Sequence, residues 1–206
     1  MGNSASNSLP ALQTVSECVT ERMMGTWFVI AVKPTMFETK NSNAVERYTW
    51  IDDAKKKNGG NDFDIDFTFN VDEPITSKIK ALPQKGWVLD NDNKQFAPGT
   101  NRLETKTGNW QVSPAWPIKM PYLLVEVDLE HYQYCVVGYP SRAYCWIMAR
   151  TPQMEEATYN DLVDKLQTKH NYDLVGLRKV PQKWTRVEAE KRNLIKDIPG
   201  HMLEKE

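Results

Sequence analysis

The chain has few cysteines and no glycosylation signal. Three of its 206 residues are cysteine, namely Cys18, Cys135 and Cys145. This small and uneven number does not suit a disulfide framework. No Asn-X-Ser/Thr sequence occurs. We therefore expect free thiols and a reducing compartment, although a bridge between Cys135 and Cys145 stays open if they lie on neighbouring strands.

Long apolar runs and an excess of charge of one sign are also missing. The longest apolar stretch, Met23 to Val32, is interrupted by Gly25 and Thr26 and falls short of the roughly 18 residues that a membrane-spanning helix needs. Lys and Arg number 26 against 27 Asp and Glu, which gives a formal net charge of -1. This balance argues against nucleic acid as a partner and favours a cytoplasmic protein with at most peripheral membrane contact.

Catalytic and metal-binding motifs are absent from the sequence. The histidines His131, His170 and His201 are scattered, and there is no H-E-x-x-H, no paired C-x-x-C, no G-x-S-x-G and no phosphate-cradling glycine loop. The sequence therefore predicts no catalytic residue, no metal and no cofactor.

The first residues lack the basic and apolar regions of a secretory signal. They match the short N-myristoylation pattern, with Gly2 as the acylated residue and Ser6 at the Ser/Thr position. One myristoyl chain anchors a protein only reversibly, so the pattern predicts partial membrane attachment. The other interpretation, a plain polar tail over 1–17, stays open.

What the sequence does contain is period-two alternation over its first 150 residues. The clearest case is 62–71, where acidic side chains alternate with an apolar set, Phe63, Ile65, Phe67 and Phe69. Strands are predicted near 25–33, 44–52, 62–71, 77–89, 101–108, 121–128, 133–139 and 143–150, with turn residues between them. The expected fold is all-β: an eight-stranded antiparallel up-and-down β-barrel, whose bore has room for about one small ligand.

Helical periodicity takes over after the last predicted strand. Thr151 and Pro152 suit the N-cap and first position of a helix, and apolar residues recur on one face as far as His170. One C-terminal α-helix over 152–170, packed outside the barrel, is therefore predicted, with a short strand within 172–180.

The final segment, 183–206, is rich in charge. It offers little to bury beyond Trp184, Leu194 and Ile195, which predicts a mobile or short helical appendage. The predicted division is thus a polar segment over 1–17, the barrel with its helix over 18–182, and this tail.

Gly25, Trp27 and Arg150 mark the two ends of the predicted barrel sequence. A Gly-X-Trp opens the first strand, and Arg150 ends the last. An indole can fill the narrow end of a barrel, and a guanidinium can stack on its face while donating hydrogen bonds to nearby carbonyls. These residues predict a closed floor below a cup that holds a ligand.

A family resemblance rests on three stretches: Val136 to Pro152, which reads VVGYPSRAYCWIMARTP, Glu21 to Trp27, and Pro34 to Phe37. Together they resemble the lipocalins, in the branch with plant temperature-induced lipocalins, bacterial outer-membrane lipocalin and apolipoprotein D. The likeness extends over about 15–182. It implies a monomer that binds or carries small hydrophobic molecules such as fatty acids, lysolipids, sterol-like or carotenoid-like compounds, with a role in protecting membrane lipids under stress.

The resemblance also assigns side chains to the cavity. It makes Trp146 a cavity tryptophan, Tyr48 a cavity tyrosine and Phe37 part of the loop at the mouth. If Arg150 points inward, period two turns Met148 and Tyr144 inward as well, and it turns Val29 and Ala31 inward with Trp27. The predicted ligand-lining set is Trp146, Tyr48, Phe37, Met148, Tyr144, Phe67, Phe69 and Val29, with simple core packing left open for the phenylalanines.

Residues 113–121 contain three prolines, which predicts a loop instead of a paired strand. Trp116, Ile118 and Met120 are too apolar for an ordinary exposed loop. The segment resembles the apolar proline-rich loop of plant lipocalins, which implies membrane contact or a gate at the mouth. A loop folded onto the barrel rim stays open.

Two further functions stay open. A lipocalin-fold enzyme, an isomerase or de-epoxidase, would need a reactive thiol or acid inside the bore, and Cys135 is the candidate. A stress-protective scaffold or scavenger would bind lipid only incidentally.

Overall fold

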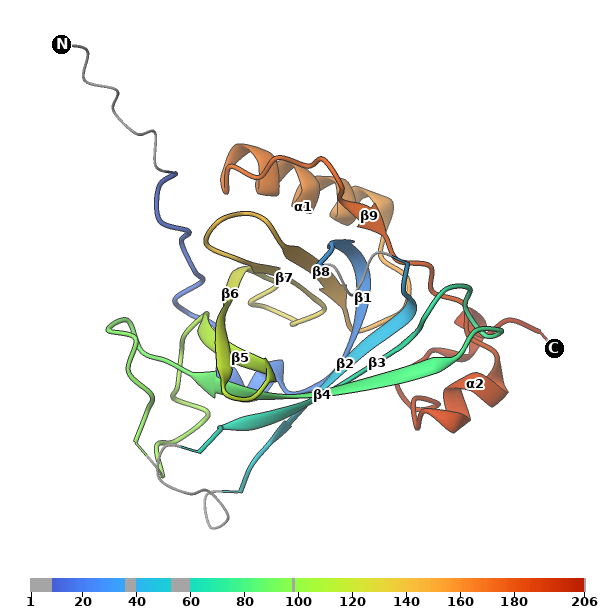
Figure 1. Cartoon of the computed structure of the whole chain (residues 1–206), viewed down its shortest axis with the longest axis horizontal. Coiled ribbons are helices and arrows are strands. Elements are labelled where there is room, and N and C mark those ends of the chain that lie inside the picture. The colour runs from blue at the N-terminus through green and yellow to red at the C-terminus, as the bar shows by residue number, and fades with distance from the viewer. Residues whose placement is uncertain (1–8, 36–39, 53–59, 98, 206) are drawn as a thin grey trace.

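The computed structural model describes residues 9–35, 40–52, 60–97 and 99–205. Eight antiparallel strands follow one another around the molecule, and β1 pairs with both β2 and β8, which closes the sheet into a barrel (Figure 1). The predicted all-β barrel is confirmed. Its strands are β1 (Gly25–Lys33), β2 (Ser42–Trp50), β3 (Phe63–Asn70), β4 (Ile79–Val88), β5 (Asn109–Ala115), β6 (Ile118–Val127), β7 (Tyr134–Gly138) and β8 (Cys145–Ala149).

Shorter elements close the ends and cover the outside of the barrel. The helix α1 (Glu156–Thr168) lies against β7, β8 and β1, while α2 (Arg186–Lys191) lies on the far side, next to β2 and β3 (Figure 1). A ninth strand, β9 (Arg178–Lys179), pairs with β1. Among the described residues, short 3-10 turns lie before β1, η1 (Thr20–Met23), and near the C-terminus, η3 (Gly200–Met202).

One predicted strand, 101–108, is wrong. The backbone N–H groups of Glu104 and Thr105 both donate to the Asn101 carbonyl, which folds the segment into a turn, and Leu103 is 65% exposed. The Asn101 side chain also accepts from the Leu103 N–H at 3.1 Å, a local bond that competes with strand pairing. The fifth strand begins only at Asn109.

The loop predicted at 113–121 is also wrong, because these residues form the β5–β6 hairpin. Pro121 lies opposite Gln111 on β5, while β7 pairs with β6 only from Leu123 onward. The missing N–H of Pro121 therefore faces an edge with no neighbouring strand, where proline is tolerated. The other two prolines lie at the end of β5 and in the turn.

The helix begins four residues later than predicted, at Glu156, with Glu155 in the N-cap position. Thr151 does not cap it, since its hydroxyl donates to the Gln153 carbonyl at 2.7 Å. Of the strand predicted within 172–180, only Arg178 and Lys179 pair.

The barrel wall has an apolar cluster on each side. The inner cluster includes Trp27, Val29 and Val32, whereas Ala31 packs outside against Leu162 and Leu166 of α1. A bulge between Val29 and Ala31 shifts the register of β1 against β8, so the prediction that Ala31 points inward is wrong. Phe28 and Ile30 also face outward, in a third cluster with residues of the C-terminal segment.

The C-terminal segment completes the wall where β1 and β2 separate. Only Gly25 to Phe28 of β1 pair with β2. Beyond Phe28, the Val180 N–H donates to the Ile30 carbonyl, and the Gln182 side-chain amide donates to the carbonyls of Val29 and Ala44. Residues 180–182 thus fill the gap between the two strands, and the chain that follows is packed against the barrel. Its buried apolar residues are Trp184, Ala189, Leu194 and Ile198.

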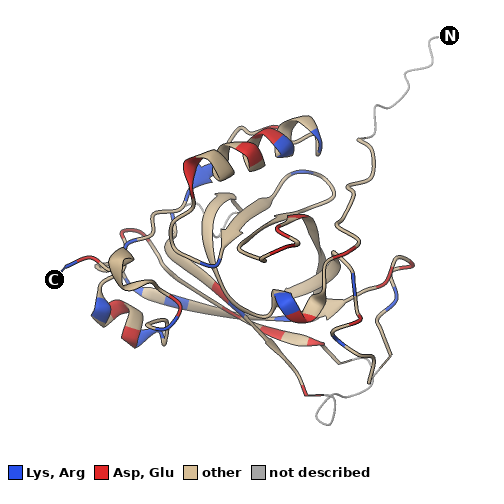
Figure 2. Ribbon diagram, turned by 180° about the vertical axis from the view of Figure 1, so that it is seen from behind, with Lys and Arg blue, Asp and Glu red and all other residues tan. Residues whose placement is uncertain are grey.

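Charged residues of both signs are mixed along α1, α2 and the barrel strands (Figure 2). In the described part of the chain, no helix is long and apolar enough to span a bilayer. Gly2, the predicted acylation site, and Phe37, the predicted mouth residue, lie outside the described residues.

Candidate ligand-binding site

Arg150 and Trp27 meet at the closed end of the barrel. The guanidinium carbon of Arg150 lies 3.7 Å from the centre of the Trp27 ring, and the Trp27 Nε1 donates to the Met23 carbonyl at 2.7 Å. Arg150 donates to the carbonyls of Thr26 at 2.9 Å and Arg22 at 2.7 Å, and to that of Tyr132 at 3.3 Å. The stacked pair therefore joins η1, β1 and the β6–β7 turn into one floor.

Gly25 makes this arrangement possible. Its φ is +95°, a conformation that side-chain-bearing residues rarely adopt, and a Cβ there would lie 3.4 Å from the Arg150 Nη1. Burial lowers the pKa of Arg150, while Cys135, Tyr48 and Asp197 act in the opposite direction. Because an arginine guanidinium stays protonated in proteins, the floor carries a fixed positive charge.

The predicted lining residues come together inside the barrel. Tyr48, Met148, Trp146, Phe67, Phe69 and Val29 all belong to the inner cluster, and Tyr144 packs against its edge. Trp146 is 6% exposed and the other members of the cluster are less exposed. These side chains fill much of the bore, so a ligand can enter only if some of them move. A cavity beside Trp50 and Val88, of about 10 Å³, is too small for an organic ligand.

The inner cluster also contains a polar group that the sequence analysis missed. Glu46 is buried, and its Oε2 accepts hydrogen bonds from the hydroxyls of Tyr48 at 2.7 Å and Tyr122 at 2.8 Å. The two hydroxyl oxygens are 2.5 Å apart. Strand parity could have found Glu46, because it stands two residues before Tyr48 on β2 and therefore faces the same side. We call these three residues the acid trio.

Comparisons with known proteins agree with this geometry. The family model described as a lipocalin-like domain matches residues 19–182, most of the chain. Temperature-induced lipocalin-1 of Arabidopsis thaliana is 30% identical over 181 residues, which cover 86% of this chain and 87% of that protein. The chain belongs to the lipocalin family.

Other relatives of this lipocalin are more distant. A putative lipocalin of Acanthamoeba polyphaga mimivirus is 27% identical over 143 residues, covering 69% of this chain and 73% of that protein. Insecticyanin from the tobacco hornworm Manduca sexta superimposes with a TM-score of 0.55 at 15% identity, covering 87% of each chain. A cockroach allergen, Per a 4, does so with a TM-score of 0.54 at 13% identity, covering 86% of this chain and 97% of its own. These solved structures support the fold alone.

The cysteines of this lipocalin are free and buried. Cys135 faces the inner cluster and Cys145 the outer one, so the two lie on opposite faces of the sheet and cannot form the bridge left open above. Burial raises the pKa of Cys135 well above its usual value, and that of Cys145 to about 11. A thiol that holds its proton is a poor nucleophile, which weighs against the enzyme alternative. Among the described residues, no cluster of three or more His, Cys, Asp or Glu could hold a metal.

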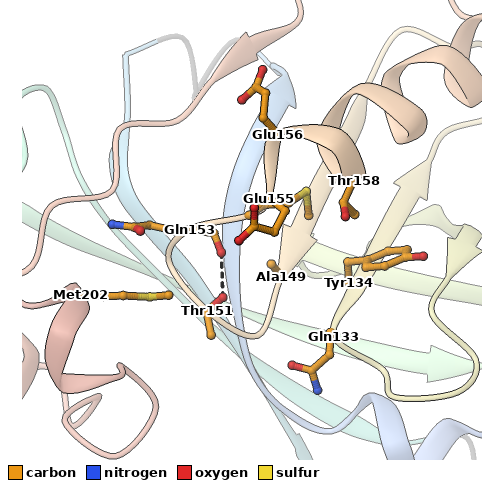
Figure 3. Close-up of a pocket in the computed structure, with 10 residues that line it drawn as sticks. Gln133, Tyr134, Ala149, Thr151, Gln153, Glu155, Glu156, Thr158 and Met202 are labelled. Carbon is orange, nitrogen blue, oxygen red and sulfur yellow. Dashed lines mark hydrogen bonds between the residues drawn. The ribbon is translucent and has the colours of Figure 1, made fainter.

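A larger hollow, of about 520 Å³, lies outside the lipocalin wall (Figure 3). Ala149 lies at its back, with Tyr134 and Met202 on opposite sides. Most of its lining is polar, unlike a typical site for a hydrophobic ligand. The polar members are Gln133, Tyr134, Thr151, Gln153, Glu155, Glu156 and Thr158.

The β5–β6 hairpin projects apolar side chains from the rim. Trp116 and Ile118 are each 66% exposed, while Met120 is partly buried against the inner cluster. The Trp116 ring stacks near Trp87 with centroids 6.1 Å apart, and the Lys119 ammonium lies 3.8 Å from the Trp87 ring centre. Of the three residues predicted to contact a membrane, two are therefore at the surface.

Proposed function

We propose that this lipocalin binds one small hydrophobic molecule in its bore, as a cytoplasmic monomer, and performs no chemistry on it. The observation that carries the proposal is the combination of a closed floor, Trp27 with Arg150, and a wall whose inward side chains are mainly aromatic and aliphatic. Such a cup offers an apolar ligand a place out of water.

The affinity of such a cup can be estimated from apolar burial. Each buried methylene contributes about 0.8 kcal/mol before ordering costs, so a long chain can reach micromolar affinity. Because the bore is filled in the structure described here, part of that free energy is used to displace inner side chains. Trp146 is a candidate to move. It lies opposite Val32, four residues before Arg150 and therefore away from the floor, and it is the most exposed of the buried lining residues.

Replacing Trp146 with alanine should weaken binding of a neutral probe, N-phenyl-1-naphthylamine, about tenfold, which corresponds to about 1.4 kcal/mol of lost aromatic contact. Fluorescence titration measures both the affinity and the quenching of tryptophan emission. Trp116→Ala is the matched control, because Trp116 lies on the exposed hairpin, and its affinity should equal that of the parent. An unchanged affinity and unchanged quenching in Trp146→Ala would place the ligand elsewhere.

The exposed hairpin supports a second proposal, peripheral attachment to a lipid surface. Trp116 and Ile118 form an apolar tip, and Lys85 and Lys119 lie beside it, with the Lys85 ammonium 6.0 Å from the Trp116 ring centre. Aromatic side chains flanked by lysines suit the boundary between lipid and water. A myristoyl chain on Gly2 would supply a second, independent anchor.

Flotation with vesicles that contain anionic lipid tests the hairpin. We expect Ile118→Asp to reduce the bound fraction at least fivefold, because a carboxylate must then enter the apolar layer, and Trp116→Ala to reduce it about threefold. Val175→Asp is the matched control, since Val175 is 77% exposed on the turn after α1 and should not affect binding. Equal flotation of all four proteins would contradict the proposal.

A further inference from the structure

The inner cluster contains an indole N–H for which the described residues offer no acceptor. Trp110 of β5 is fully buried, and its Nε1 lies within hydrogen-bond distance of no acceptor among them. The donors closest to it in the cluster are satisfied, because the hydroxyls of Tyr48 and Tyr122 both donate to Glu46. A buried donor that stays unpaired costs free energy, so the presence of this one inside the barrel calls for a role.

The position of Trp110 relates it to the ligand. Its ring centre lies 6.1 Å from that of Tyr48, which belongs to the predicted lining, and Trp110 stands directly opposite Tyr122 of β6. The Tyr122 ring in turn lies 6.1 Å from that of Trp146, the candidate to move. A molecule that takes the place of Trp146 would therefore lie against Tyr122, on the strand next to Trp110, and one step further into the cluster brings it to the indole N–H.

Other indole N–H groups are unpaired as well, but they lie elsewhere. In the described part of the chain, the Nε1 atoms of Trp50 and Trp87 also lack an acceptor. Trp50 is partly exposed at the end of β2, where the Arg102 guanidinium lies 5.2 Å from its ring centre. Trp87 lies outside the inner cluster and stacks near Trp116 of the exposed hairpin. Of these three indoles, Trp110 is the one that is fully buried inside the bore.

We propose that Trp110 selects the polar group of the ligand, so that this lipocalin prefers an apolar molecule with a neutral hydrogen-bond acceptor, the carbonyl oxygen of a ketone or an ester, placed on the Trp110 Nε1. The acceptor satisfies the buried donor in a medium of low dielectric, where such a bond is strong. A neutral oxygen suits the position, because the burial of a charged group in an apolar cluster costs more than one N–H returns. The inference rests on the proposed function and names a ligand class for it.

The test compares two probes of the same shape, 2-acetylnaphthalene and 2-isopropenylnaphthalene, in which a CH₂ group replaces the carbonyl oxygen. Each competes with N-phenyl-1-naphthylamine for the full-length protein. Trp110→Phe removes the N–H but keeps an aromatic ring. In this variant the ratio of ketone affinity to alkene affinity should fall at least fivefold relative to the parent, because one hydrogen bond is lost. Both probes lose the same ring contact, so the ratio isolates the hydrogen bond.

Trp87→Phe is the matched control, because it also removes a buried, unpaired indole N–H, but outside the inner cluster. It should keep the affinity ratio of the parent within twofold. An equal ratio in the parent and in Trp110→Phe overturns the inference while the proposed function stands. If neither probe displaces the dye, the proposed function fails with it.

A second measurement decides if Trp110→Phe does not fold, as judged by circular dichroism. In NMR spectra of the parent, the proton on the Trp110 Nε1 should move downfield when the ketone is added, because it enters a hydrogen bond, and it should move less with the alkene. The two probes have the same aromatic ring, so ring-current effects are matched between them. The same shift with both probes overturns the inference.

Discussion

Arg150→Ala is expected to lower the free energy of unfolding by about 3–5 kcal/mol, measured by urea denaturation. The parent guanidinium donates to three carbonyls and stacks on a fully buried indole. Its removal leaves the carbonyls of Thr26, Arg22 and Tyr132 without their charged donor at a partly buried site, and it opens space above Trp27.

A lysine at position 150 separates charge from geometry. Arg150→Lys keeps the positive charge but cannot reach three carbonyls with one ammonium, so it should recover less than half of the loss. Arg102→Ala is the matched control: Arg102 pairs with Glu21 at 3.7 Å near the surface, and its loss should cost less than about 1 kcal/mol. A loss below about 1 kcal/mol in Arg150→Ala would mean that the floor does not depend on this side chain.

The barrel could be predicted because its strands alternate with period two. Seven of the eight strand positions were found in this way, and β1 was placed at its observed bounds. Trp27 at the start of the first strand and Arg150 at the end of the last predicted the closed end, because an indole can fill the narrow end of a barrel and a guanidinium can stack on its face. Within the strands that were found, parity failed at Ala31, where a bulge shifts the register, and nothing in the local sequence marks that bulge.

The misplaced strand and the misplaced loop have different causes. The sequence around 101–108 alternates as a strand should, yet Asn101 holds it in a turn. Residues 113–121 contain prolines that suggest a loop, yet their missing N–H groups fall where no neighbouring strand is present, as at Pro121. The first outcome follows from local hydrogen bonds that compete with strand pairing. The second depends on which edge of the sheet has a partner, and this is a property of the tertiary structure.

The acid trio and the C-terminal segment show two further limits of sequence reasoning. A glutamate in a strand is expected to face outward, and only its spacing of two residues from Tyr48 indicates that Glu46 faces inward. Its partner Tyr122 lies 76 residues away on β6, so the sequence does not indicate the contact. The sequence predicts a charged tail after Pro181, because the few apolar residues there form no strand or helix periodicity that would predict packing. The gap between β1 and β2, which this segment fills, is visible only in the closed barrel.

Trp184→Ala tests whether the C-terminal segment is part of the fold. The Trp184 ring meets Phe28 edge to face at 5.8 Å, its Nε1 donates to Gln182, and the Arg192 guanidinium lies 4.7 Å from its ring centre. Truncating a fully buried tryptophan typically costs about 3–5 kcal/mol, and we expect a loss in that range by urea denaturation.

Val187→Ala on α2 is the matched control, because Val187 is 45% exposed and its loss should cost less than about 0.5 kcal/mol. A mobile appendage, as the sequence predicts, would make Trp184→Ala equally harmless.

The same variant tests whether the segment holds β1 and β2 together. If Trp184→Ala frees the segment, the hydrogen bonds from Gln182 to the carbonyls of Val29 and Ala44, which join the two strands where they separate, are lost as well. Amide exchange of β1 residues 29–32 should therefore accelerate more than that of β6, whereas a uniform change would mean that Trp184 stabilises the whole barrel without closing this gap.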